Sequence, residues 1–243
     1  MKRTFFIFLF FSLTIMINAQ NHFDYLQYVD ETVRDGTLLY DDKKNEAIYI
    51  DRSETMRNIR DVDYGGALLV SVNSGENDYF FKNESKELQY TGILLKIPYL
   101  ILDKIGEIEW QFVNETKEIQ GYKCHKAFTE FRGRKWEVWY SPEIPVQYGP
   151  WKFANLPGLL FEATDESKRF GFQLTAIKTS DELENLTVNL KDYRKVDMKT
   201  YDQQLADALN FKSLSNSRYY TIEGEPFKRQ GIELIYEWEE NND

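Results

Sequence analysis

Strand-like segments separated by turns of only a few residues dominate this sequence. Residues 36–40 and 46–50 flank the polar turn DDKKN, and residues 159–165 and 169–177 are separated by ESK alone. Strands joined this closely pair as antiparallel neighbours, because a parallel pair needs a crossover of about a dozen residues or more. The sequence therefore predicts a mainly β fold, a curved antiparallel sheet or half-barrel built as a meander with one or two helices packed on it.

Further strand segments have turn-forming residues at their ends. They lie at residues 66–72, 78–82, 86–91, 108–114, 121–131 and 135–141, with an acidic turn expected at 115–119. In the last segment Trp136, Val138 and Tyr140 alternate with Lys135 and Glu137. A period of two places alternate side chains on opposite faces, so one face of this strand should be packed.

Only two segments favour a helix. The better one covers residues 197–210, where Asp197 is a good N-cap and apolar residues recur at helical spacing. A short helix is also expected at residues 24–33, before the first strand.

The N-terminus predicts export. Lys2 and Arg3 precede an apolar run, and Ala19 is a small residue of the kind at which signal peptidase cuts. The run is shorter than the ~20 residues that cross a bilayer. We expect a signal peptide at residues 1–19, no membrane span after its removal, and a location in the periplasm, at the outer membrane or outside the cell.

The remainder of the chain, residues 20–243, is expected to form a single β domain, and its C-terminal segment, residues 213–243, gives no clear packing signal. The chain holds 40 acidic and 30 basic residues, a net charge of −10. A surface this negative repels phosphate backbones, so we expect no nucleic-acid partner. The sequence does not predict the oligomeric state.

The single cysteine, Cys124, cannot form an internal disulfide and is expected to be a small buried hydrophobe. His125 is its neighbour on a strand, so the two side chains should point to opposite faces and should not form a catalytic pair. The sequence contains no nucleophile elbow, phosphate loop, dinucleotide motif, zinc-protease motif or EF-hand. We therefore predict no catalytic set, cofactor or metal site.

Two other functions remain open. A hydrolase could use paired carboxylates near Glu137, Glu143 or Glu162. A periplasmic copper protein could use His125, or His22, which becomes the third residue after cleavage behind Ala19.

One loop contains four of the six prolines, between Pro142 and Pro157. It also carries four large side chains: Tyr148, Trp151, Phe153 and Leu156. This composition argues against disorder. The loop either closes the core at one end of the sheet, or its four large side chains line a groove for an apolar or peptide ligand.

The end of this loop has the composition of a structural turn. Pro157 fixes its own φ, and Gly158 accepts a positive φ, as the second central residue of a type II turn must. Asn155 is the residue after glycine that best tolerates the left-handed region. We expect these three residues to fix the backbone so that the loop returns to the sheet.

The runs ETKEIQGYKCHKA and RGRKWEVWYSPEIPVQYGPWKFANLPGLLFEATD resemble the GLPGLI family, also called Porph_ging, of secreted Bacteroidetes proteins. The resemblance is strongest over residues 110–165, and the hexapeptide is Asn155–Leu160, with asparagine in place of the first glycine and leucine in place of the last isoleucine. It implies an exported protein of unknown function, often encoded near TonB-dependent receptors, with no known catalytic residues. An outer-membrane receptor is accordingly a candidate partner.

The favoured interpretation is a non-enzymatic envelope protein that binds an apolar or peptide ligand, with a link to outer-membrane TonB-dependent transport. It depends on the export signal, the aromatic loop and the lack of catalytic motifs.

Overall fold

The computed structural model describes residues 21–58, 78–83, 87–180, 186–216, 229 and 231–239. These residues form one 12-stranded sheet with the order β12-β6-β5-β4-β3-β2-β1-β11-β10-β9-β8-β7. The elements are β1 His22–Val29, β2 Thr32–Asp41, β3 Glu46–Asn58, β4 Asp78–Lys82, β5 Leu88–Leu94, β6 Ile97–Asp103, β7 Gln111–Ile119, β8 Tyr122–Phe131, β9 Arg134–Ser141, β10 Leu159–Asp165, β11 Phe170–Lys178, β12 Arg194–Asp197 and α2 Met198–Asn216.

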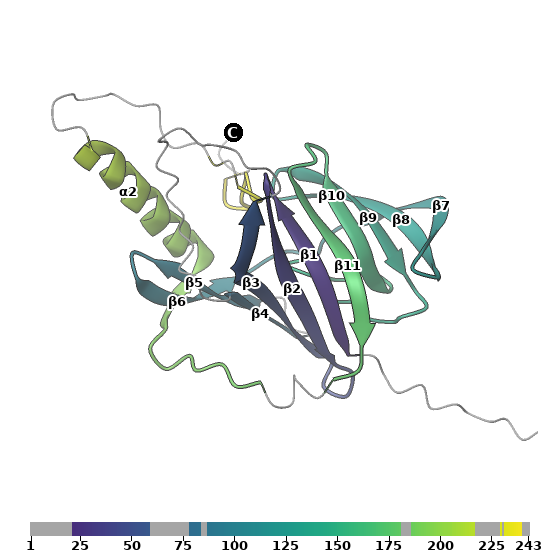
Figure 1. Ribbon diagram of the computed structural model, residues 1–243. Helices are drawn as coiled ribbons and strands as arrows, with labels where there is room; N and C mark the ends of the chain where they lie inside the picture. Colours follow the sequence, from purple (N-terminus) through teal and green to yellow (C-terminus); the bar gives the residue numbers. More distant parts are fainter. Residues whose placement is uncertain are drawn as a thin grey trace, which may run out of the picture.

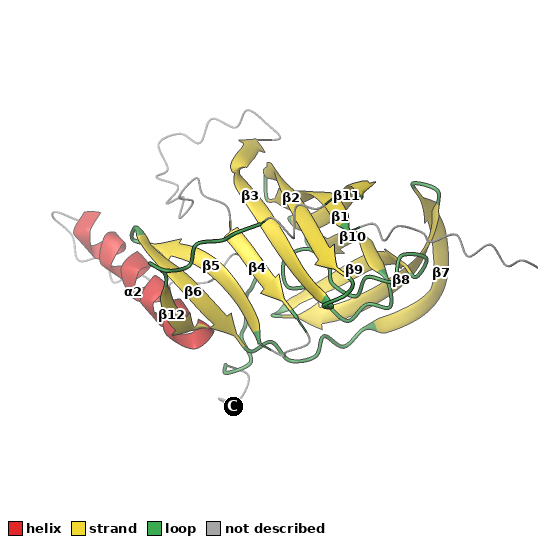
Figure 2. Cartoon of the chain, turned by 90° about the horizontal axis from the view of Figure 1, so that it is seen from below, coloured by secondary structure: helices red, strands yellow, loops and turns green. Residues whose placement is uncertain are grey.

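The sheet consists of two antiparallel meanders placed side by side. Strands β1 to β6 form one and β7 to β11 form the other, and the antiparallel pair β1–β11 joins them. Among the strands of the described ranges, β12 alone pairs in parallel, with β6. The sheet is strongly curved but open, with β7 at one free edge and the β6–β12 pair beside α2 at the other (Figures 1 and 2). The predicted fold class, a curved antiparallel sheet with a helix, is confirmed.

Two-residue turns with left-handed backbone connect β7 to β8 and β8 to β9. Gln120 and Gly121 have φ of 53° and 83°, and Arg132 and Gly133 have φ of 52° and 76°. Positive φ at both central residues is typical of the type I′ turn, whose twist matches that of the flanking strands. The acidic turn expected at 115–119 is wrong, because these residues belong to β7 and the chain reverses at Gln120–Gly121.

The helix expected at residues 24–33 is also wrong. This segment forms the end of β1, a turn at Asp30 and the start of β2. Phe23 and Tyr25 are buried and alternate with the partly exposed Asp24. Pairing with β2 and β11 on both sides of β1 therefore overrides the local helix preference. The strand expected at 66–72 lies outside the described residues.

The helix predicted at 197–210 is confirmed as α2. Asp197 accepts hydrogen bonds from the Thr200 amide (3.0 Å) and the Thr200 hydroxyl (2.7 Å), as an N-cap does. The helix packs its Met198 and Tyr201 against the β5–β6 end of the sheet, where Tyr201 meets Tyr99 edge to face. It covers that end of the sheet, away from the strands of the main core.

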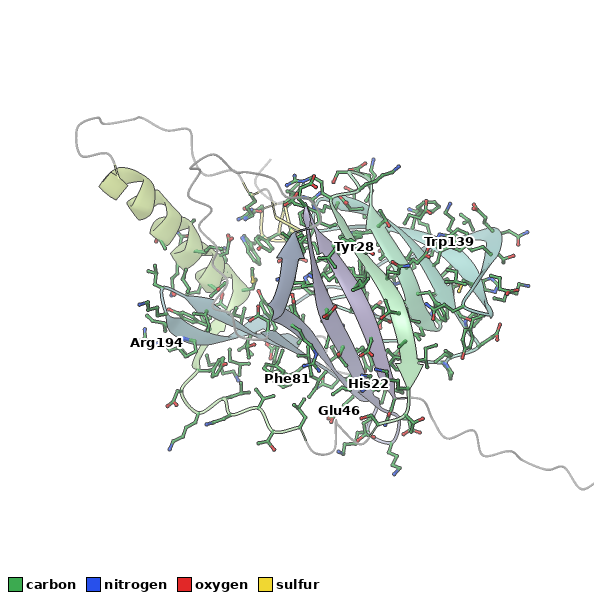
Figure 3. The ribbon with its side chains drawn as sticks, in the orientation of Figure 1. His22, Tyr28, Glu46, Phe81, Trp139 and Arg194 are labelled. Carbon is green, nitrogen blue, oxygen red and sulfur yellow. The ribbon has the colours of Figure 1, made fainter. Side chains whose placement is uncertain are left out.

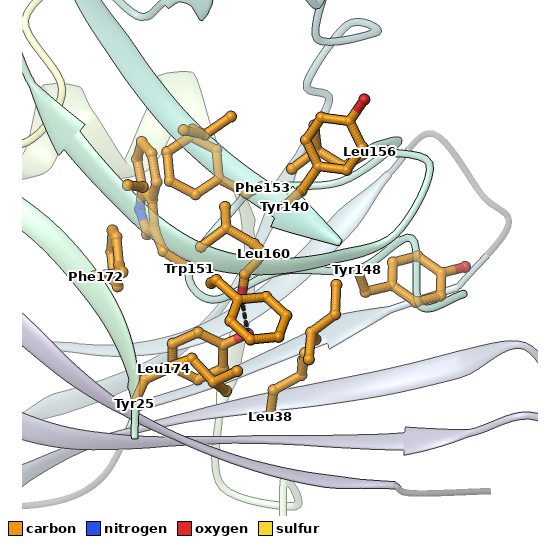
Figure 4. Packing of buried hydrophobic residues seen from close by; sticks show 14 of the residues in the cluster. Tyr25, Leu38, Tyr140, Tyr148, Trp151, Phe153, Leu156, Leu160, Phe172 and Leu174 are labelled. Atoms are coloured by element: carbon orange, nitrogen blue, oxygen red, sulfur yellow. Dashed lines mark hydrogen bonds between the residues drawn. The ribbon is translucent and has the colours of Figure 1, made fainter. Parts of the chain in front are cut away.

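The main core lies where the two meanders meet and includes the proline loop. Buried side chains of β1, β2, β3, β9, β10 and β11 pack there with Trp151 and Phe153 of the loop (Figure 4). The Tyr25 hydroxyl donates to the Leu160 carbonyl oxygen at 2.7 Å and so links β1 to the end of the loop. The loop is therefore part of the core.

The predicted signal peptide, residues 1–19, lies outside the described residues, as does much of the segment after α2. In the described part of the chain, no helix is long and apolar enough to cross a membrane.

Gly158 offers a direct test of the loop's backbone. A Cβ at this position would lie 2.1 Å from the Ser141 carbonyl oxygen, and φ is 156°. We expect Gly158→Ala to lower the free energy of unfolding by more than about 2 kcal/mol, because backbone must shift to accept the methyl group. Urea denaturation measures this loss. Gly106→Ala is the control, since nothing lies within 4 Å of its Cβ position, and equal stability of the two variants would contradict the prediction.

Candidate functional site

The four large side chains of the proline loop are buried. Tyr148 and Trp151 are each 4% exposed, Leu156 is 3% exposed and Phe153 is fully buried. Phe153 meets Trp136 edge to face at 5.0 Å between ring centres, and Trp151 stacks parallel to Phe172 at 6.4 Å. The loop thus closes the core, and Tyr148 also lines a cavity beside it.

A tight turn from Gly149 to Phe153 places these rings. The Gly149 amide donates to the Phe153 carbonyl oxygen at 3.0 Å, and the Phe153 amide donates to that of Pro150 at 3.1 Å. Trp151 has a left-handed φ of 50°, and Asn155 has a φ of 65°, as expected for that residue. Gly158, at 156°, departs from the ~80° of a type II turn, so its glycine is required by the close approach of Ser141 described above.

Two buried lysines hold this turn. Lys82, at the end of β4, donates to the carbonyl oxygens of Gly149 and, at 3.1 Å, Phe153. Burial lowers the pKa of Lys82 well below its usual value. Lys152, within the turn, donates to Asp103 (2.6 Å) and Glu233 (2.7 Å). The turn is therefore fixed to β4, to β6 and to the C-terminal segment 231–239.

Arg132 extends this network. Its guanidinium forms a two-pronged contact with Asp103, at 2.7 and 3.1 Å, and also contacts Glu233 (2.8 Å) and Glu237 (3.0 Å). Burial acts to raise the pKa of Asp103, but Lys152 and Arg132 outweigh it and leave that pKa lowered. The cluster is thus a buried set of ion pairs in which each charge has partners.

A small cavity lies beside the turn, and we call it the loop pocket. Its volume is about 290 Å³, and its wall comes from the β2–β3 turn, the ends of β4 and β5, the loop after β6 and the proline loop. Most of its side chains can form hydrogen bonds. The lining residues are Asn45, Lys82, Asn83, Glu87, Leu88, Ile105, Gly106, Glu107, Ile108, Gln147, Tyr148, Lys152, Ala154 and Asn155.

A larger concavity, which we call the sheet-face groove, lies over β8, β9 and β10 and has a volume of about 710 Å³. It is lined by Gln111, Phe128, Thr129, Glu130, Lys135, Trp136, Glu137, Thr164, Asp165, Glu166 and Lys168. Glu137 lies between Phe128 on β8 and Thr164 on β10 in the strand register. Phe128 is 36% exposed, so the groove combines an apolar ring with carboxylates, an amide and a hydroxyl.

One end of the groove is rigid because Asp165 holds the β10–β11 turn. Asp165 is buried and accepts from Arg134 at 2.8 Å and from the backbone amides of Arg169 and Phe170, both at 2.9 Å. Burial acts to raise its pKa, but the hydrogen bonds, with Ser167 first among them, leave that pKa lowered. Asp165 is therefore an anchor of the turn.

Only one of the three carboxylates considered for hydrolysis, Glu137, lines the groove. Glu162 pairs with Lys117 at 2.5 Å, and Glu143 accepts from the Lys123 amide at 3.0 Å. Glu137 contacts Lys126 at 3.2 Å and accepts from the Trp139 indole, also at 3.2 Å. Trp139 lies at the β7–β9 end of the molecule in Figure 3. Glu130, which the sequence did not single out, also lines the groove. Pairing of β8 with β9 brings it close to Glu137.

The two histidines and Cys124 lie in separate surroundings. His22 begins β1 and contacts Asp24 at 2.8 Å, whereas His125 on β8 lies beside Tyr140. Burial raises the pKa of the Cys124 thiol to about 12, so Cys124 is a buried hydrophobe as expected. Among the described residues, no group of three or more His, Cys, Asp or Glu side chains could hold a metal ion.

Sequence reasoning singled out Tyr148, Asn155 and Glu137 but missed most of the other side chains that line the two cavities. Lys82 is the last residue of an apolar strand, DYFFK, where a lysine usually marks the solvated end. Phe128 and Glu130 are both exposed and lie two residues apart, on the same face of β8. A two-residue spacing of Phe128 and Glu130 opposite Glu137 is the one signal that could have indicated a shared face.

Comparisons with known proteins gave a family match over part of the chain and similar solved structures. A family model described as "N-glycanase peptide, N-terminal domain" matches residues 96–203. Two crystal forms of PNGF-II resemble the chain, with a TM-score of 0.51 in each and identities of 14% and 16%. The match covers 78% of this chain but only 34% and 33% of those chains, so this chain spans about a third of their length. No curated protein sequence matches.

These findings correct the resemblance to the GLPGLI family. The family model that matches is the N-terminal domain of an N-glycanase, and the similar structures are of PNGF-II. The hexapeptide that suggested the other family serves backbone geometry and core packing here. Such a run reports how a loop folds, and by itself it does not identify a family.

The lowered pKa of Lys82 predicts how the free energy of unfolding changes with pH. Because the folded-state pKa lies below the usual 10.5, the unfolded chain binds more protons between these two values, and stability must rise with pH in that window. We expect wild type to gain stability relative to Lys82→Met as pH increases toward 10, by at most about 1.4 kcal/mol per pH unit. Urea unfolding of both proteins from pH 7 to pH 10 measures this difference. A constant difference would show that the buried amine is protonated throughout.

Proposed function

We propose that this chain is a non-enzymatic binding module for N-linked glycopeptides, with the sheet-face groove as its site. The observation that carries the proposal is the combination, in one open groove, of the exposed Phe128 ring with Glu130, Glu137 and Gln111. The resemblance to an N-glycanase N-terminal domain supports the same class of ligand.

The groove has the chemistry that sugars require. The C–H face of a pyranose ring packs on an aromatic ring, and its hydroxyl groups donate to carboxylate and amide oxygens. Phe128 supplies the ring, and Glu137, directly across the strand pair from Phe128, supplies an oxygen beside it. Because these side chains project from neighbouring strands of a rigid sheet, little ordering accompanies binding.

The neighbouring sheet edge suits the peptide part of the ligand. β7 is the last strand of the sheet, and its Phe112 and Val113 are 55% and 39% exposed. Gln111, the first residue of β7, pairs with Phe128 and also lines the groove. A glycan in the groove would therefore place its attached peptide close to exposed apolar side chains. This arrangement refines the expectation of a peptide ligand and moves the site away from the buried rings of the proline loop.

A hydrolase is the second candidate, because two carboxylates share the groove. Glu130 and Glu137 are diagonal neighbours across β8 and β9, a relation that separates Cβ atoms by about 7–8 Å. Paired catalytic carboxylates in glycosidases lie ~5–10 Å apart. The matched family model bears the name of a glycan-releasing enzyme, but it describes an N-terminal domain, and this chain spans only a third of the similar structures. Binding without cleavage is therefore the proposed activity.

We also propose that the protein acts outside the cytoplasm. An exported protein would meet glycopeptides outside the cytoplasm, and the predicted signal peptide at residues 1–19 would deliver it there. Delivery of a captured glycopeptide to an outer-membrane receptor would join this function to the transport link expected from the sequence.

The test uses one biantennary N-glycopeptide, the same peptide without glycan, and the free glycan. We expect calorimetry to show tightest binding to the glycopeptide, and we expect Phe128→Ala and Glu137→Gln each to weaken it roughly tenfold, as loss of a contact worth ~1–2 kcal/mol would do. Leu95→Ala and Glu118→Gln are matched controls, because both residues lie outside the groove and are exposed.

Mass spectrometry of the incubated glycopeptide separates the two candidates. Intact ligand after prolonged incubation, with binding that depends on the groove, supports the binding module. If wild type releases the glycan and both Glu130→Gln and Glu137→Gln fail to do so, the protein is a hydrolase and the binding-module proposal is wrong. Absence of binding at millimolar glycopeptide, or equal loss in the control variants, would overturn the proposed site.

A further inference from the structure

The loop pocket contains two buried lysines with different partners. Lys152 is ion-paired with Asp103 and Glu233, at 2.6 and 2.7 Å. Lys82 is 5% exposed and donates only to the carbonyl oxygens of Gly149 and Phe153. Among the described residues, Lys82 forms no ion pair with a carboxylate. The two amines therefore differ in what stabilises a positive charge on them.

This difference determines which amine can act as a nucleophile. An ion-paired ammonium has no free electron pair, whereas a neutral amine keeps one after donating both of its hydrogens. Burial without a counter-ion lowers the pKa of Lys82. With its two hydrogens directed to Gly149 and Phe153, the remaining electron pair of Lys82 is available to an electrophile.

The pocket offers such an electrophile both space and partners. Its volume is about 290 Å³, enough for one small molecule, and amide side chains such as Asn45, Gln147 and Asn155 line it. These groups form hydrogen bonds with hydroxyls. Gly106 borders an open part of the pocket, with nothing within 4 Å of its Cβ position.

We propose that the loop pocket is a covalent site for small hydroxyaldehydes, such as the open-chain form of a reducing sugar, with the Lys82 amine as the reversible nucleophile. This site is separate from the sheet-face groove, because the two share no lining residue. It therefore does not depend on the proposed glycopeptide binding.

The chemistry balances without a further reactant. The Lys82 nitrogen forms a bond to the carbonyl carbon of the aldehyde as the carbonyl π bond opens, and one of the two amine protons passes through solvent to the oxygen to give a carbinolamine. The hydroxyl oxygen takes a second proton from solvent, the carbon–oxygen bond breaks and water leaves, and the nitrogen returns its remaining proton to solvent. An amine and an aldehyde thus yield an imine and one water molecule, and added water reverses the reaction.

The experiment traps this imine in the folded full-length protein. Glyceraldehyde is added with cyanoborohydride at pH 7.5 for a short time, and peptide mass spectrometry locates the label. We expect Lys82 to be labelled at least about tenfold faster than Lys152, because Asp103 and Glu233 hold Lys152 as an ion-paired ammonium whereas Lys82 donates only to carbonyl oxygens. The same reaction in concentrated urea should remove the preference, since unfolding exposes both amines to water.

Three variants separate a specific site from general reactivity. Lys82→Arg keeps a donor for the loop carbonyl oxygens but forms no imine, so only the Lys82 label should disappear. Gly106→Trp should slow labelling of Lys82 by filling the pocket, whereas Gly231→Trp, also at an open position but away from it, should not. Circular dichroism checks that each variant is folded.

Two results would overturn the proposal. One is labelling of Lys82 only in urea, which would show that the amine is sealed in the native protein. The other is equal labelling of Lys82 and exposed lysines such as Lys43 in the folded chain, with no effect of Gly106→Trp. Neither result depends on whether glycopeptides bind the groove.

Discussion

Burial of the turn from Gly149 to Phe153 is the constraint on which the rest of this structure depends. The turn places Trp151 and Phe153 in the core, but it also takes carbonyl oxygens and Lys152 out of water. Buried polar groups cost free energy unless each has a partner. Lys82 donates to the carbonyl oxygens of Gly149 and Phe153. Lys152 forms ion pairs with Asp103 and Glu233. The aromatic rings can therefore pack in the core only if both lysines also find their partners.

The same requirement determines where the C-terminal segment lies. Glu233 joins Lys152 to Arg132 at the β8–β9 turn, and the Leu234 amide donates to the Arg132 carbonyl oxygen at 2.9 Å. Buried ion pairs contribute little net stability, because desolvation offsets most of their attraction, but loss of one partner is strongly destabilising. We infer that this cluster mainly selects one position for residues 231–239. It thereby links the two ends of the sheet through a single set of charges.

Local patterns in the sequence predicted most of the strands and the helix. Alternation in 135–141, the hairpin at 159–177 and the Asp197 cap all depend on neighbours a few residues away, and all three appear in the structure. The error at 24–33 arose because β1 is held by strands distant in sequence. The turn at Gln120–Gly121 was placed too early because acidic residues outweighed the glycine signal.

The candidate sites could not be read in the same way, because each assembles side chains from separate segments. Large apolar residues in a proline-rich loop are equally suited to a ligand or to a core, and only the fold shows that Trp151, Phe153 and Leu156 are buried. Lys82 gains its unusual surroundings from a turn that begins 67 residues later. Glu130 and Glu137 become neighbours through strand pairing.

The two sites differ in how the fold supports them, and this difference follows from the loop. The sheet-face groove lies on strands whose opposite face is packed by the core, so its shape depends on the sheet. The loop pocket is built from connections between strands, so its shape depends on the turn that Lys82 and Lys152 hold. Burial of the aromatic rings therefore does more than close the core. The buried turn places Lys82, which has no counter-ion among the described residues, at the wall of the loop pocket. The rings pack on the inner face of β9 and β10, so the outer face of these strands is left for the sheet-face groove.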